Sequence, residues 1–269
     1  MLQKNLKPFL VDAKNYTELR YQENRSEGIT FVDGNIVGNS KSTNSGISAR
    51  VWSQGNWGFA SNPNVTDDEV RKVIQSANEN AIFMSSKEKL GMPSLPVTVG
   101  NNSTEFFTKK PRLSRKELID FIQTIDSHLK EKYPNLASRA VVSNSLDMEK
   151  LLVTSTGSEA YSMIPRSIFY IDMTIVVNGE PINLYDVYGG LGQFEDLFTT
   201  PEVMFEQIAK QYKHLMNKSE GIHADAGLKD VILDADLAGI LSHEAIGHTT
   251  EGDLVLGGSV AGDYLGQKV

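Results

Sequence analysis

The chain has 269 residues, of which 40% are hydrophobic and 22% are charged, a composition that is typical of globular proteins and excludes wholesale disorder. Its 26 basic and 34 acidic residues give a net charge of −8, which argues against a nucleic-acid-binding surface. No apolar run approaches the roughly 20 residues that a membrane-spanning helix needs. The chain has no cysteine and therefore supplies neither disulfides nor thiolate metal ligands.

We expect a cytoplasmic protein that binds neither nucleic acid nor a membrane, because residues 1–25 also contain no signal-peptide core. The acidic surplus is concentrated near the carboxyl end. Residues 220–269 hold nine acidic side chains against Lys229 and Lys268. Such a surplus is found both at cation sites and on solvated surfaces, and the composition alone leaves the two open.

The amino-terminal part has the pattern of β-hairpins. Strands are expected at 17–22, 29–32 and 36–37 around an Asp33-Gly34 turn, and alternation in 47–51 and 57–59 flanks a turn at Gln54-Gly55-Asn56. Two tryptophans, Trp52 and Trp57, border that second turn, where sheet packing or a subunit contact is expected. Arg50 lies among apolar strand residues, which suits either a buried ion pair or a contact to a peptide substrate.

Two capping boxes mark the next helices. Thr66 with Glu69 begins a helix whose apolar stripe runs from Val70 to Ile82, and Ser114 with Glu117 begins another with a stripe from Leu118 to Leu129. Between them, Pro93 and Pro96 indicate a loop.

After Pro134 the β pattern resumes. Residues 140–143 and 151–154 are expected to pair as a hairpin, and strands at 168–177 and 182–187 flank an Asn178-Gly179 turn. The run 188–192 (YGGLG) lacks the dinucleotide-binding spacing and indicates a turn or a close backbone approach. A third helix is expected from Pro201 to about Met216, with Thr199 and Glu202 as its capping box.

The carboxyl end begins with a linker at 221–227. A short buried strand is expected at 231–233, followed by a helix from about Ala235 to Thr250 that is capped by Asp234 or Asp236. Because strands and helices come in blocks, the pattern favours an α+β fold. We expect three regions: an α+β domain at 1–130, a β-rich region with a helix at 131–220, and a truncated domain at 221–269.

One short motif on this last helix carries chemistry. His243 and Glu244 are followed by His248 in the order H-E-A-I-G-H. A His-Glu pair with a second histidine is how zinc proteases supply two imidazole ligands and a general base, but there the histidines are four residues apart. A spacing of five separates them by about 140° on a regular α-helix. We therefore predict a π-bulge, or a bend at Gly247, within residues 245–247.

The same residues have a plain structural interpretation. His243 and His248 could be ordinary helix residues, one packed and one solvated, with Glu251 and Asp253 as surface acids. The acidic surroundings, the small residues Ala245 and Gly247, and the strand expected at 231–233 favour the metal site instead.

Residues 231–253 closely resemble the signature of the TldD/PmbA family of zinc metalloproteases, also called modulators of DNA gyrase. Residues 32–36, 46–51 and 55–60 resemble that family's opening hairpins. The resemblance implies an amino-terminal α+β part followed by the start of a β-rich catalytic domain that carries the motif helix. It also implies that this chain is the amino-terminal portion of a TldD-like catalytic subunit.

The resemblance assigns roles to the matching positions. His243 and His248 would be zinc ligands, and Glu244 would be the base that takes a proton from the attacking water. Glu251 and Asp253 match positions that are usually acidic and would contact the ligands, not the metal. The family's third ligand is a downstream cysteine, which this chain lacks. We therefore expect weak zinc binding and negligible hydrolysis by the chain alone.

The resemblance further implies hydrolysis of small or unfolded peptides by a zinc-dependent metallopeptidase. The expected partners are a peptide substrate and either a homologous PmbA/TldE-type subunit or a second copy of the chain. A non-catalytic binding or assembly subunit, which keeps the motif without completing the site, is the alternative.

Overall fold

The computed structural model describes residues 2, 4–87, 99–256 and 258–268, so Pro93 and Pro96 of the expected loop lie outside the described residues. The chain divides into two compact units, Met1–Gly221 and Ile222–Val269. The fold is α+β, as the block pattern of the sequence predicts.

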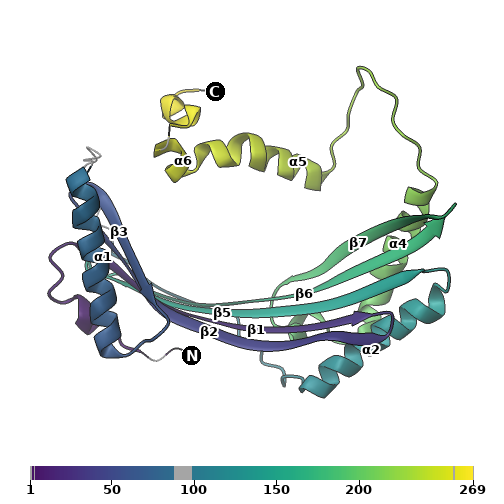
Figure 1. Cartoon of the computed structure of the whole chain (residues 1–269), viewed down its shortest axis with the longest axis horizontal. Coiled ribbons are helices and arrows are strands. Elements are labelled where there is room, and N and C mark those ends of the chain that lie inside the picture. The colour runs from purple at the N-terminus through teal and green to yellow at the C-terminus, as the bar shows by residue number, and fades with distance from the viewer. Residues whose placement is uncertain (1, 3, 88–98, 257, 269) are drawn as a thin grey trace. The chain divides into compact units, whose positions relative to one another are not determined.

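The first unit is built on one seven-stranded sheet (Figure 1). The strand order is β3-β2-β1-β5-β6, and β6 pairs along its other edge with both β4 and β7. All pairings are antiparallel except that of β4 with β6. The strands are β1 (Tyr16–Val32), β2 (Asn35–Ser53), β3 (Asn56–Asn62), β4 (Asn101–Glu105), β5 (Ser138–Thr154), β6 (Glu159–Val177) and β7 (Glu180–Leu191).

Three hairpin turns in this sheet confirm the sequence prediction. Asp33-Gly34, Gln54-Gly55 and Asn178-Gly179 each have positive φ at both residues. This is the backbone of a type I′ turn, whose twist matches that of the strands it joins.

The strands are longer than the sequence suggests, and one prediction about them is wrong. Residues 140–143 and 151–154 do not form a hairpin, because both lie in the single strand β5. The polar stretch between them stays extended because β5 is hydrogen-bonded to β1 on one side and β6 on the other. In the same way, β1 runs without interruption through the polar residues between the two strands expected there.

The long helices begin close to the predicted positions. α1 spans Asp67–Lys87, α2 spans Arg115–Lys132, and α4 spans Phe205–Ser219. Ser114 and Glu117 form the complete reciprocal capping box at α2. At α1 the Thr66 hydroxyl accepts from the Glu69 N–H, whereas the Glu69 carboxylate bonds to other side chains.

Shorter helical turns complete the first unit. They are η1 (Lys7–Leu10), α3 (Phe194–Leu197) and η2 (Pro201–Met204). The third predicted helix therefore starts as the 3₁₀ turn η2 before continuing as α4. Its N-cap is Thr200 instead of Thr199.

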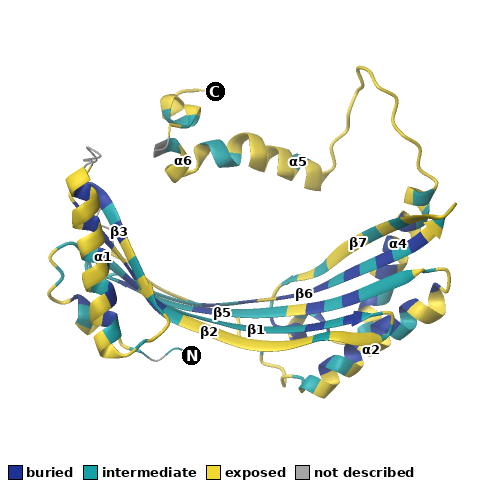
Figure 2. Ribbon diagram, in the orientation of Figure 1, coloured by how far each residue is buried: buried dark blue, intermediate teal, exposed yellow. Residues whose placement is uncertain are grey.

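Two hydrophobic cores form on the same face of the sheet, the outer face of its bend (Figures 1 and 2). One lies under α2, α3 and α4 and the other under α1 and η1. Strand β3 approaches α1 so closely that a Cβ on Gly58 would lie 2.0 Å from the carbonyl oxygen of Ala77. The largest buried side chains of the two cores are Phe31, Phe169, Ile122, Ile125, Leu129, Ile171, Met173, Met204, Leu6, Leu19 and Ile47.

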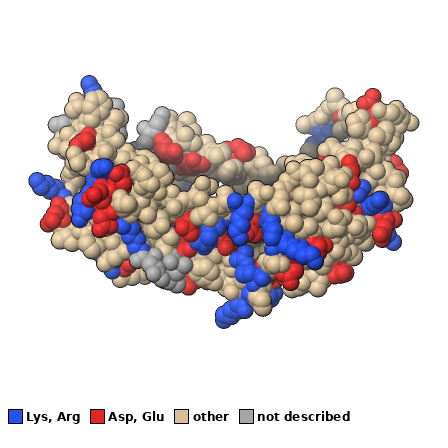
Figure 3. All heavy atoms as spheres, turned by 60° about the horizontal axis from the view of Figure 1, so that its bottom comes forward, with Lys and Arg blue, Asp and Glu red and all other residues tan. Residues whose placement is uncertain are grey.

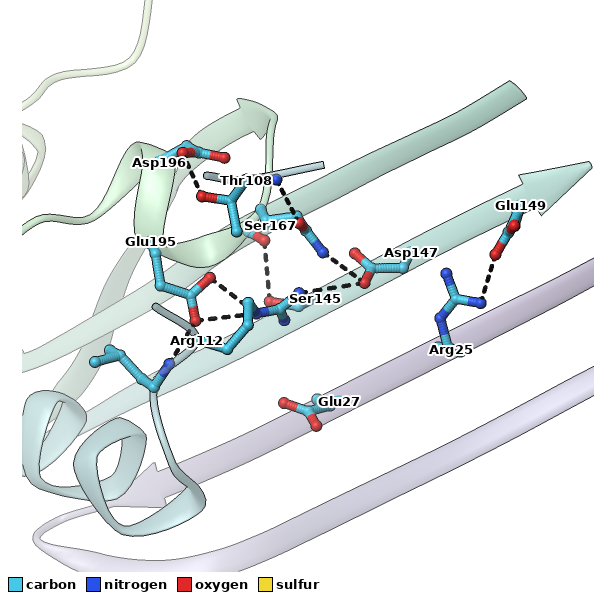
Figure 4. Close-up of polar contacts among 12 residues, drawn as sticks. Arg25, Glu27, Thr108, Arg112, Ser145, Asp147, Glu149, Ser167, Glu195 and Asp196 are labelled. Atoms are coloured by element: carbon cyan, nitrogen blue, oxygen red, sulfur yellow. Dashed lines mark hydrogen bonds and ion pairs between the residues drawn. The ribbon is translucent and has the colours of Figure 1, made fainter. Parts of the chain in front are cut away.

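A charged strip crosses the sheet between the two cores. Arg25 pairs with the buried Glu149 at 2.8 Å, and Arg112 contacts both Glu195, at 3.1 Å, and Asp147, at 3.4 Å (Figure 4). Figure 3 looks toward this side of the molecule and shows positive and negative side chains interspersed there. Charge pairing thus replaces hydrophobic packing along the middle of the long strands.

The second unit is helical. It consists of α5 (Ala235–Ser242), the π-helical turn η3 (His243–Gly247), η4 (His248–Thr250), α6 (Gly252–Leu256) and η5 (Val260–Tyr264). None of its described residues is buried. The strand expected at 231–233 is wrong: these residues are irregular, and Ile232 is 98% exposed. A strand forms only by pairing, and no strand is present among the described residues of this unit.

No helix in the described part of the chain is both long enough and apolar enough to cross a membrane.

Candidate metal centre

The motif helix is started by Asp234. Its Oδ1 accepts a hydrogen bond from the Leu237 N–H at 2.9 Å, and its carbonyl accepts from the Ala238 N–H at 2.9 Å. Asp234 therefore satisfies one of the unpaired N–H groups at the helix start. Of the two aspartates that the sequence offers as caps, the structure uses this one.

The helix changes geometry at the motif. Residues His243–Gly247 form a π-helical turn, closed by a hydrogen bond from the His248 N–H to the His243 carbonyl. The predicted departure from α-geometry is thus confirmed, and it takes the form of a π turn. Gly247 itself has ordinary helical torsions, with φ −55° and ψ −59°, so the chain does not bend at the glycine.

The π turn brings three potential metal ligands together. His243, Glu244 and His248 each offer one ligand atom within 4.8 Å of the others. The two imidazole rings have centroids 4.4 Å apart, and the Glu244 Oε2 lies 3.8 Å from the His248 Nε2. Two donors bound to one zinc at about 2.1 Å each lie at most about 4.2 Å apart. Small side-chain rotations would therefore bring these ligand atoms within reach of one ion.

Glu251 lies behind one of these ligands. Its Oε1 is 2.6 Å from the His248 Nδ1. If Nδ1 carries the proton, it donates to Glu251 and leaves the Nε2 lone pair facing Glu244, as a metal ligand requires. Asp253 is placed differently: its Oδ1 accepts from the Leu254 N–H in the first turn of α6.

Two threonines that the sequence analysis did not single out support the turn. The Thr249 hydroxyl donates to the Ile246 carbonyl at 3.0 Å, and the Thr250 hydroxyl donates to the Ile246 and Gly247 carbonyls at 2.9 and 3.0 Å. Such back-bonding satisfies carbonyls where the helix changes from π to 3₁₀ geometry. The signal in the sequence was the pair of threonines directly after the second histidine.

Comparison with known proteins finds relatives that cover most of the chain. Residues 17–81 match the family model described as PmbA/TldA metallopeptidase domain 1. A metalloprotease of Methanocaldococcus jannaschii is 27% identical over 97% of this chain and 57% of its own length. A zinc metalloprotease TldD homolog of Saccharolobus solfataricus is 25% identical over 91% of this chain and 52% of its own. Residues 17–81 are thus similar to the first domain of PmbA/TldA metallopeptidases, and most of the chain is similar to metalloproteases that include a TldD homolog.

Two solved structures share the fold. A modulator of DNA gyrase from Bacteroides thetaiotaomicron superposes with a TM-score of 0.67 at 14% identity, over 95% of this chain and 60% of that one. TldE from Thermococcus kodakarensis gives a TM-score of 0.51 at 15% identity, over 67% of this chain and 40% of its own. The chain spans little more than half the length of the curated relatives it matches.

Proposed function

We propose that this chain is part of a zinc-dependent metallopeptidase that hydrolyses small or unfolded peptides, and that residues 222–269 belong to its catalytic domain. The observation that carries the proposal is the π turn, because it brings together two imidazoles, those of His243 and His248, that a regular helix would separate, beside the Glu244 carboxylate. The names of the relatives as metalloproteases support the same activity.

In this proposal, His243 and His248 hold the metal as neutral imidazoles. Glu251 accepts the Nδ1 proton of His248 and so fixes the ring orientation and its tautomer. Glu244 takes a proton from the attacking water and passes it to the leaving amine. Zinc, when bound, supplies a Lewis acid that polarises the scissile carbonyl and makes water acidic enough to lose that proton near neutral pH. Asp253 has no part in this mechanism; its carboxylate accepts a hydrogen bond from the Leu254 N–H at the start of α6.

We also propose a protein partner, which is either a homologous PmbA/TldE-type subunit or a second copy of this chain. The resemblance of the fold to TldE supports this proposal.

Zinc binding by the chain tests the ligand assignment. We expect at most one zinc per chain, with affinity lowered at least about tenfold by His243→Ala or His248→Ala, because each change removes one imidazole donor. His223→Ala is the matched control, since His223 is an exposed histidine of the same unit outside the cluster. Equal affinities for all three variants would refute the site.

Glu244→Gln separates binding from catalysis. The substitution is made in an active protein that contains this chain. We expect the variant to keep its zinc while its turnover of peptide falls by at least about a hundredfold, because the amide cannot accept the proton. Unchanged turnover would overturn the role of Glu244. Absence of zinc from the wild type, even after zinc is supplied, would instead favour the non-catalytic binding subunit.

A further inference from the structure

A small hollow lies on the open face of the sheet, opposite the core under α1. Along β1 and β2, Leu19, Ala49 and Val51 point into that core. Their neighbours in sequence therefore point to the other face, because side chains alternate along a strand. The hollow measures about 260 Å³ and is lined by Glu18, Arg20, Ser48, Arg50, Phe59 and Leu152. These residues come from four adjacent strands, β5, β1, β2 and β3.

One of the two arginines is already held in place. The Arg50 guanidinium lies 4.2 Å from the Trp57 ring and pairs with the Glu18 carboxylate at 3.1 Å. Tyr16 donates a further hydrogen bond to Glu18. The Arg50 charge is thus neutralised by Glu18, and the side chain forms a fixed wall of the hollow.

The other arginine has no such partner in the described part of the chain. Arg20 is exposed, and among the described residues it makes no ion pair and no side-chain hydrogen bond. It lies directly between Leu152 on β5 and Ser48 on β2. An unpaired guanidinium beside a hydroxyl presents a set of donors that matches a carboxylate.

The remaining walls are apolar. Phe59 is opposite Arg50 in the register of β2 and β3, and it is 57% exposed although it is a large aromatic residue. Leu152 closes the other side. The volume is below the roughly 300 to 1,000 Å³ of ordinary small-molecule sites, which leaves space for one amino-acid residue and not for several.

We propose that this hollow binds the carboxyl-terminal residue of a peptide, with the terminal carboxylate on Arg20 and an aromatic or large aliphatic side chain against Phe59 and Leu152. Charge selects this ligand over a phosphate. Glu18 leaves the hollow with one net positive charge, which suits a monoanion, and a phosphate would not use the apolar walls. The proposal concerns the first unit alone and does not depend on the metal centre.

The two tryptophans of the chain make the binding measurable. Both lie beside the hollow, where Trp52 and Trp57 contact each other edge to face at 5.2 Å and Trp57 stacks on Arg50. We would titrate the chain, in the presence of EDTA, with N-acetyl-phenylalanine and with its amide. Fluorescence and calorimetry should both show saturable binding of the acid, and binding at least about tenfold weaker of the amide, which has lost the charge.

Variants identify the residues. Arg20→Gln should weaken N-acetyl-phenylalanine binding at least about tenfold. Phe59→Ala should reduce the preference for N-acetyl-phenylalanine over N-acetyl-alanine. Arg166→Gln should change neither, because Arg166 is an exposed arginine on the same face, about 20 Å along β5 from Leu152. Circular dichroism checks that each variant is folded.

Three results would overturn the proposal. They are equal binding of the acid and the amide, equal effects of Arg20→Gln and Arg166→Gln, and no saturable signal by either method up to about 10 mM ligand. Because zinc is removed, none of them bears on the metal centre. Conversely, failure of zinc to bind at His243 and His248 would leave this site unaffected.

Discussion

At the scale of single residues, Glu149 shows how a charge is kept inside the first unit. Its side chain is fully buried, and it accepts hydrogen bonds from Arg25 at 2.8 Å, from the Tyr161 hydroxyl at 2.7 Å and from the Leu2 N–H. Burial acts to raise the pKa of Glu149, but these hydrogen bonds outweigh it and lower the pKa below its usual value. Burial and the same carboxylate raise the pKa of Tyr161.

Replacing this carboxylate should therefore cost stability in a pH-dependent way. We expect Glu149→Gln to lower the free energy of unfolding by about 3 kcal/mol at pH 7, because Arg25 loses its buried partner. A group with a lowered folded pKa stabilises the protein above its unfolded pKa and loses that effect as pH falls through the folded value. The difference in the free energy of unfolding between wild type and variant should thus become smaller below about pH 4.5.

Urea unfolding at pH 7 and at pH 3.5 measures both quantities. The exposed Glu180→Gln on β7 is the control and should change stability by less than about 0.5 kcal/mol at either pH. A gap for Glu149→Gln that is as large at pH 3.5 as at pH 7 would contradict the assignment of the stabilisation to the charge.

At the scale of elements, the π turn is the feature on which the metal centre depends. The histidines share a side of the helix because one extra residue is accommodated between them. Deleting Ile246 would leave a spacing of four, which a regular α-helix already places on one face. We therefore expect the deletion to keep zinc affinity within about threefold of the wild type, with the π turn replaced by α-helix.

Adding a residue should have the opposite effect. An alanine inserted after Ile246 gives a spacing of six, which separates the histidines by about 120° on a regular helix. Zinc affinity should then fall at least about tenfold. Titration of the two variants beside the wild type measures this. If insertion and deletion weakened zinc binding equally, zinc affinity would depend on the specific π-turn geometry and not on the angle between the two histidines alone.

The elements also show what the sequence can and cannot predict. The π turn followed from the histidine spacing, and the Ser114 cap and the Asn178-Gly179 turn followed from local chemistry, because each is decided within a few residues. The continuous strand β5 did not follow. Its polar middle shows no hydrophobic alternation and stays extended because of pairing with β1 and β6, which are distant in sequence. The strand predicted at 231–233 is wrong because three apolar residues do not form a strand without a partner, and no partner strand is present among the described residues of this unit.

At the scale of the whole molecule, stability is distributed unequally between the two units. Both hydrophobic cores lie within residues 6–215, whereas no described residue of 222–269 is buried. The cores are joined by β1 and β5, which contribute buried residues to each: Ile29 and Val141 to one, Leu19 and Val153 to the other. Unfolding of either core therefore removes strands from the other, and the first unit should unfold in one step.

This arrangement predicts that residues 1–221 fold without the rest of the chain. We expect the shortened chain to unfold in a single calorimetric transition within about 3 °C of the midpoint of the 269-residue chain, because it keeps every buried hydrophobic residue among those described. Leu19→Ala, in the core under α1, should lower that same transition without splitting it, by the loss of about 3 kcal/mol that is usual for a buried leucine. Two separate transitions in the Leu19→Ala variant would mean that β1 and β5 do not couple the cores. A midpoint far lower for residues 1–221 would mean that the helical unit stabilises the sheet, contrary to the distribution of buried surface.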